Sequence, residues 1–141
     1  MSADGREFVD ANVLVYACDS SAGSKHTAAL TLVERLWDTG HGCSSVQVLQ
    51  EFFVTVTRKV AHPLSIDDAA ERLREFSAWT IFAPDAGDVL DAIALHKQAR
   101  INFWDAMIVQ AASELGCGLL WSEDLAHGSR AKGATIQNPF A

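Results

Sequence analysis

The chain has few cysteines, no long apolar run and little positive charge. Cys18, Cys43 and Cys117 are odd in number and far apart, which argues against a disulfide framework and against a zinc site. No stretch approaches the roughly 20 apolar residues of a membrane span. The first ten residues carry several charges in place of an apolar signal core. We therefore expect a cytoplasmic protein with reduced thiols.

The scarcity of positive charge bears on possible partners. Eleven Lys and Arg face eighteen Asp and Glu, so the net charge is -7. This sign argues against a module that holds nucleic acid by overall attraction. It weighs less against a nuclease, because carboxylates that bind divalent cations are partly neutralised and the bound cations recruit phosphate.

What the sequence does contain is enough apolar material for one core. With 141 residues, 49% of them hydrophobic, we expect one domain over residues 1–141. Short apolar runs alternate with segments of helical periodicity, which is typical of an α/β fold. We expect a three-layer α/β/α domain with a mostly parallel sheet of four to five short strands, the last of them, 134–136, at an edge. The predicted helices cover residues 27–39, 65–76, 85–100 and 103–115, and a further long helix is capped by Ser44 or Ser45 and ends near Pro63.

Four carboxylates stand out by their places in this pattern. Asp10 and Asp124 each follow an apolar strand directly, so both should lie at the carboxyl edge of the sheet. Asp105 falls in the first turn of a predicted helix, where a carboxylate also complements the helix dipole. Glu51 lies inside a helix, and periodicity alone favours a solvated face there. Asp10 is the strongest candidate for a functional role. A carboxylate within an apolar segment costs free energy unless it is paired with another group or bound to a metal.

Four motifs in order carry a resemblance to a known family. They are F-V-D-A-N-V-L-V-Y from Phe8 to Tyr16, S-S-V-Q-V-L-Q-E-F-F from Ser44 to Phe53, I-N-F-W-D-A-M-I-V-Q-A-A from Ile101 to Ala112, and L-L-W-S-E-D-L from Leu119 to Leu125, the last followed by G-A-T-I-Q-N-P-F. Together they resemble the PIN-domain nucleases, and most closely the VapC-type toxins of toxin-antitoxin pairs. The resemblance extends over almost the whole chain.

The resemblance implies a site and an activity. It implies that Mg²⁺, or Mn²⁺ in its place, is bound by Asp10, Glu51, Asp105 and Asp124. Asn12 and Ser122 are implied as supporting residues, and the adjacent Glu123 stays open as an alternative fourth ligand. The implied activity is that of an endoribonuclease toxin that hydrolyses RNA without a covalent enzyme intermediate. The implied partners are a second copy of the chain, as a homodimer, and a small antitoxin that inserts a segment into the acidic cleft.

Two other interpretations stay open at this level. A Mg²⁺-dependent phosphatase also places acids after its first strand, but Asn12 stands where the D-x-D start of the haloacid-dehalogenase-like enzymes has its second Asp. A non-catalytic module of the same fold that only binds RNA or a protein is the second alternative. The presence of all four acids argues against it, and metal binding would distinguish the two.

Overall fold

The computed structural model describes residues 5–141 of the chain. Its strands are β1 (Glu7–Val9), β2 (Gly42–Ser45), β3 (Thr80–Phe82), β4 (Leu119–Trp121), β5 (Arg130–Ala131) and β6 (Ala134–Gln137). Its helices are α1 (Ala11–Cys18), the 3-10 helix η1 (Ser20–Ala22), α2 (Ser24–Thr39), α3 (Val46–Arg58), α4 (Ile66–Phe76), α5 (Ala86–Ala99) and α6 (Phe103–Glu114).

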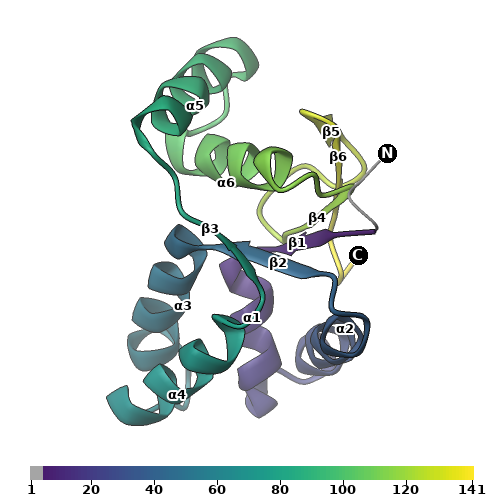
Figure 1. The fold of residues 1–141 in the computed structure, drawn as a ribbon. Helices are drawn as coiled ribbons and strands as arrows, with labels where there is room; N and C mark the ends of the chain where they lie inside the picture. The colour runs from purple at the N-terminus through teal and green to yellow at the C-terminus, as the bar shows by residue number, and fades with distance from the viewer. Residues whose placement is uncertain (1–4) are drawn as a thin grey trace.

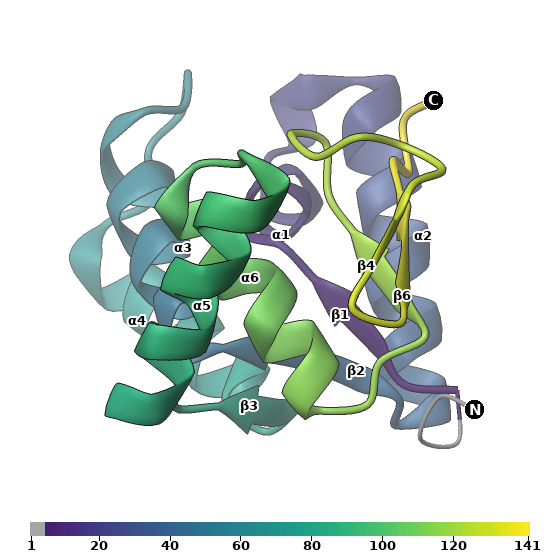
Figure 2. The same cartoon turned by 90° about the horizontal axis from the view of Figure 1, so that it is seen from above.

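The strands form one sheet in the order β3-β2-β1-β4-β6-β5, and every pair except β5 with β6 is parallel. Helices α1 to α4 cover one face of this sheet, and α5 and α6 cover the other (Figures 1 and 2). The predicted three-layer α/β/α class is confirmed. None of the helices within residues 5–141 combines the length and the apolar character that a membrane span needs.

The last part of the sheet differs from the prediction. The strand expected at the edge, β6, lies inside the sheet between β4 and β5. The edge is formed by β5, which has two residues and pairs antiparallel to β6 through Arg130 and Thr135. A two-residue strand is too short to show an alternation of apolar and polar side chains, so the pattern gave no sign of it.

The central strands and α6 supply the most deeply buried part of the core. Phe8, Val9 and Leu120 have no accessible surface. Helix α6 is buried continuously from Ala106 to Ala112, because the sheet covers one side of it and α5 packs on the other. A helix that is covered on both sides does not need one polar and one apolar face. The sequence of α6 is accordingly apolar on almost every side.

Helix α5 presents a different face to its neighbour than its sequence suggests. The sequence from Asp85 to Arg100 repeats the apolar residues Val89, Leu90, Ile93 and Ala94 on one face. In the structure Ala92 is fully buried against Ala106 and Met107 of α6, with Val89 beside it. Leu90 and Ile93 are 65% and 45% exposed. The repeat does not mark one buried face, because α5 packs mainly against α6 and Ala92, the fully buried residue at that contact, lies outside the repeat.

Candidate metal centre

The four predicted acids line a single pocket at the carboxyl ends of β1 and β4. Strand β1 has β2 on one side and β4 on the other, so the chain order reverses between β1 and β4, where open α/β sheets bind their ligands. The pocket has a volume of about 180 Å³. Its polar lining comes from four separate segments of the chain and consists of Asp10, Asn12, Gln47, Glu51, Thr55, Asp105 and Asp124. None of the described residues that line it is Lys, Arg or His.

Asp10 is the most buried of these acids. It caps the N-terminus of α1, where its Oδ1 accepts from the Ala11 N–H at 2.7 Å. The Ser122 hydroxyl donates to the other carboxylate oxygen at 2.8 Å. Burial raises the pKa of Asp10 to about 6, although these two hydrogen bonds act in the opposite direction, and the charges of Glu51 and Asp124 raise it further. Asp10 is therefore a buried carboxylate surrounded by like charge.

A small hydrogen-bond network joins Asp10 to Asp124. The Ser122 oxygen that donates to Asp10 also accepts from the backbone N–H of Asp124, at 3.2 Å. The Asn12 side-chain amide donates to Asp124 Oδ2 at 3.0 Å. Both residues that the resemblance implies as supporting thus contact the acids of the pocket. The network fixes the turn after β4 relative to the start of α1.

The neighbouring acid, Glu123, faces another group of side chains. Its carboxylate pairs with Lys25 Nζ, and the Tyr16 hydroxyl donates to it at 3.2 Å. The ammonium of Lys25 also lies 5.1 Å from the centre of the Tyr16 ring. Glu123 does not line the acidic pocket, whereas Asp124 does. The geometry therefore favours Asp124 as the fourth acid of the pocket.

Asp105 and Glu51 reach the pocket from helices. Asp105 lies in the first turn of α6, where its N–H donates to the Asn102 side chain at 2.8 Å and Asn102 Nδ2 donates back to Asp105 Oδ2 at 2.8 Å. Burial and the charge of Asp124 raise the pKa of Asp105, while Asn102 acts against the shift. Glu51 is exposed on α3, and Gln47, one turn earlier, donates to it at 2.8 Å.

The donor set suits a hard divalent cation. Carboxylate, amide and hydroxyl oxygens are the ligands that Mg²⁺ and Mn²⁺ prefer. The described lining offers several carboxylates and no basic side chain to compensate them. Burial, with a smaller contribution from neighbouring carboxylates, raises the pKa values of Asp10 and Asp105, and a bound cation would favour their ionised forms. The residues present therefore fit such an ion.

A tighter group of acids lies elsewhere. Within residues 5–141, the one group of three acids whose oxygens all lie within 4.8 Å of one another is Asp88, Asp91 and Glu114. These acids have local partners: Asp88 accepts from the Asp85 N–H, and the buried Gln110 donates to both Asp91 and Glu114. These hydrogen bonds, at the start of α5 and at its contact with α6, account for the close approach of the three acids.

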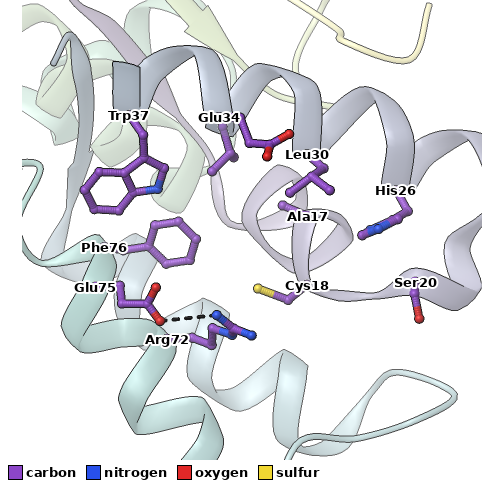
Figure 3. A pocket seen from close by; sticks show the side chains of 11 residues that line it. Ala17, Cys18, Ser20, His26, Leu30, Glu34, Trp37, Arg72, Glu75 and Phe76 are labelled. Atoms are coloured by element: carbon purple, nitrogen blue, oxygen red, sulfur yellow. Dashed lines mark hydrogen bonds and ion pairs between the residues drawn. The ribbon is translucent and has the colours of Figure 1, made fainter. Parts of the chain in front are cut away.

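A larger pocket of about 310 Å³ lies between α2, α4 and the end of α1 (Figure 3). Trp37 and Phe76 form its apolar wall, and Arg72 and Glu75 form an ion pair across 3.2 Å at its rim. It shares no lining residue with the acidic pocket. Two of its described lining residues are carboxylates, against four in the acidic pocket, so the acidic pocket is the candidate centre.

Comparison with known proteins places this fold in a family. Residues 8–132 match the PIN domain, and the chain belongs to the PIN domain family. Members of this family are typically nucleases that use divalent metals. A search of curated protein sequences gives no match.

Three solved structures show the same fold at low sequence identity. A toxin-antitoxin complex from Klebsiella pneumoniae has a TM-score of 0.68 at 16% identity, covering 94% of this chain and 97% of that one. VapBC2 from Rickettsia felis, bound to a DNA fragment from its promoter, has a TM-score of 0.65 at 18% identity, with 94% and 97% coverage. VapC20 from Mycobacterium tuberculosis, a toxin that cleaves the sarcin-ricin loop, has a TM-score of 0.62 at 16% identity, with 81% and 86% coverage.

Sequence reasoning missed two features of the site. Gln47 contacts Glu51, and the signal for this was its position four residues earlier on the same helix face. The contact of Tyr16 and Lys25 with Glu123 joins residues about 100 positions apart. No local pattern could have shown that contact.

Proposed function

We propose that this chain is a Mg²⁺-dependent endoribonuclease, acts as one domain over residues 1–141, and is the toxin of a toxin-antitoxin pair. The observation that carries the proposal is the convergence of Asp10, Glu51, Asp105 and Asp124 on one pocket without a compensating basic side chain. The fold of the toxins in the complexes described above supports it. RNA as substrate is supported by VapC20, whose target is the sarcin-ricin loop.

In this proposal the four carboxylates hold one or two Mg²⁺ ions, with Mn²⁺ as a substitute. Bound there, such an ion would supply a water of lowered pKa and would neutralise charge that develops on the phosphodiester. Net hydrolysis adds water across one P–O bond: the hydroxyl joins phosphorus and the departing sugar oxygen takes a proton. Ser122 and Asn12 orient Asp10 and Asp124, and Asn102 orients Asp105.

The proposal includes partners and a place of action. The toxins of similar fold occur in complexes with antitoxins, and a basic antitoxin side chain would pair with the carboxylates of this pocket. A homodimer is the expected assembly of the toxin itself. The proposed place of action is the cytoplasm, whose reducing conditions would keep the three free cysteines as thiols.

The test is RNA cleavage by the purified chain in Mg²⁺ or Mn²⁺, with a chelator control and two matched variants. Asp105→Asn removes a proposed ligand. Asp68→Asn changes an acid in the equivalent helix position, since the Asp68 N–H donates to Ser65 as the Asp105 N–H donates to Asn102. We expect EDTA and Asp105→Asn each to reduce cleavage by about 100-fold or more, and Asp68→Asn to retain it.

Other results would favour the alternatives. If the wild-type chain cleaves no RNA and calorimetry detects no binding of Mg²⁺ or Mn²⁺, the chain is a binding module with the fold and without the chemistry. If it binds Mg²⁺ and hydrolyses small phosphate monoesters but not RNA, the phosphatase interpretation gains support. Cleavage that survives both EDTA and Asp105→Asn would refute the proposed metal site.

A further inference from the structure

Trp104 is an exposed aromatic side chain beside the acids. It is 61% exposed and precedes Asp105 in the first turn of α6. Six other large apolar side chains within residues 5–141 are exposed, but Trp104 alone among them lines the acidic pocket. An indole ordinarily contributes a large buried area to a core or an interface. An indole left in solvent next to a polar site therefore calls for a functional explanation.

The structure fixes Trp104 relative to the acids from two sides. The Gln47 side-chain amide donates both to the Trp104 carbonyl, at 3.3 Å, and to Glu51, at 2.8 Å. The ring of Phe103 meets the indole edge to face, with 5.0 Å between the ring centres and 72° between the planes. Phe103 itself packs against the small core between α5 and α6. The contacts with Gln47 and Phe103 therefore hold Trp104 in place beside the acids.

The surroundings of Trp104 define what it can bind. The described part of the pocket combines this one large aromatic surface with carboxylates and amides. A ligand that fits must offer a flat apolar face and, close to it, a group attracted to cation-bearing carboxylates. A nucleobase joined through its sugar to a phosphodiester has both, and any of the four bases can stack on an indole.

We propose that Trp104 is the stacking platform for an unpaired nucleobase next to the phosphodiester that is cut, so that the substrate is single-stranded at that point. This inference rests on the proposed nuclease function and assigns to Trp104 the positioning of its substrate. A base inside a duplex is stacked on its neighbours and paired, so it is not available to an indole unless the duplex opens. Trp104 therefore selects loops, bulges or single-stranded segments.

The experiment compares wild type, Trp104→Phe, Trp104→Ala and the control Ile66→Ala, which changes a side chain that is 70% exposed and does not line the pocket. Each protein is given a short RNA that contains a mapped cut site, the same RNA annealed to its complement, and a copy with an abasic nucleotide next to the cut. We expect Trp104→Ala to raise KM on the single strand by about 5- to 150-fold, with kcat changed less. Trp104→Phe should recover most of the loss, and Ile66→Ala should behave as wild type.

The abasic RNA and a fluorescent base separate stacking from other effects. On the abasic RNA, wild type and Trp104→Ala should have equal KM values. A 2-aminopurine at the same position should be quenched when the wild type binds, in the fast phase that precedes cleavage, and not when Trp104→Ala binds. Equal KM values for wild type and Trp104→Ala on the intact single strand would overturn the inference, as would equal cleavage of single strand and duplex by the wild type.

Failure of this inference is distinguishable from failure of the proposed function. If the wild type cleaves in Mg²⁺, and Asp105→Asn abolishes cleavage while Trp104→Ala leaves KM unchanged, the nuclease proposal stands and the stacking role falls. A Trp104→Ala protein that loses its dimeric state but keeps its KM would assign the indole to a protein contact instead, and would also overturn the inference.

Discussion

Asp10 links stability to pH at the scale of a single residue. Its pKa of about 6 lies above the ordinary value of 3.8, so ionisation of this group opposes folding above about pH 6. The opposition disappears as the pH falls toward 4. Without metal, we therefore expect Asp10→Asn to be more stable than the wild type at pH 7.5, by about 1–3 kcal/mol, with the difference vanishing near pH 4.

Urea unfolding of both proteins in EDTA, at pH 7.5 and pH 4, measures this difference. Addition of Mg²⁺ at pH 7.5 should raise the stability of the wild type and leave Asp10→Asn unchanged, because only the native ligand set binds the ion. Binding should also weaken below about pH 6, where a proton competes for Asp10. A less stable Asp10→Asn in EDTA at pH 7.5 would contradict the argument.

The assignment of the fourth acid is also a question about single residues. Glu123 is engaged by Lys25 and Tyr16, whereas Asp124 lines the pocket and is held by Asn12. We expect Asp124→Asn to abolish measurable Mg²⁺ binding in calorimetry and to reduce cleavage by about 100-fold or more. Glu123→Gln should change both by less than about 10-fold. The reverse order of effects would exchange the roles of the two acids.

At the scale of elements, an ion pair between the buried Glu7 and the half-exposed Arg35 ties β1 to α2 and β4. Glu7 is 7% exposed. Its carboxylate accepts two hydrogen bonds of 2.8 Å from Arg35 of α2 and one of 2.8 Å from Trp121 Nε1 of β4. Burial by itself would raise the pKa of Glu7, but the hydrogen bonds and the charge of Arg35 outweigh it, and the pKa is lowered. This pair stabilises the strand that leads into Asp10.

Removal of Arg35 should therefore destabilise the fold in a pH-dependent way. Because the pKa of Glu7 is lowered in the folded state, the pair contributes fully above the ordinary pKa of 4.5. Its contribution is lost as the pH falls through the folded value. Because the Arg35 side chain is 47% exposed, water screens part of this pair, and we expect Arg35→Met to cost about 1 kcal/mol at pH 7, and progressively less below pH 4.5. Urea unfolding checks this, with Arg74→Met, from an exposed pair on α4, as a control that should change stability by less than about 0.5 kcal/mol. An equal loss at pH 7 and pH 3.5 would refute the role of Glu7 ionisation.

What the sequence could predict also differs from element to element. Helix α6 was predictable because Asn102 caps it and a continuous apolar run follows. The place of Asp10 was predictable because an apolar strand precedes it. The buried face of α5 was not, since it depends on which helix packs against it. Strand β5 was not either, because two residues carry no periodicity. Contacts such as Tyr16 with Glu123 arise only when distant segments meet.

At the scale of the whole molecule, the exposed apolar side of α5 is the feature that a lone monomer does not explain. Leu90 and Ile93 face solvent on a helix that covers the sheet only through α6 (Figure 1). Neighbouring exposed apolar side chains mark protein contacts more often than isolated ones do. The homodimer that we propose would bury this side of α5, and a stable contact needs about 800 Å² per partner.

The mass in solution tests this arrangement directly. Light scattering coupled to size exclusion should give twice the chain mass of 15.2 kDa. Leu90→Glu should shift the wild-type dimer to monomer, because a charge at the contact would lose its hydration on association. The side chain is 65% exposed, so the fold itself should tolerate the change, and an unaltered unfolding midpoint at low protein concentration would show this. Ile66→Glu, at an exposed position on α4, should remain dimeric. A wild type that is monomeric at micromolar concentrations, or a Leu90→Glu protein that stays dimeric, would exclude α5 as the contact between copies.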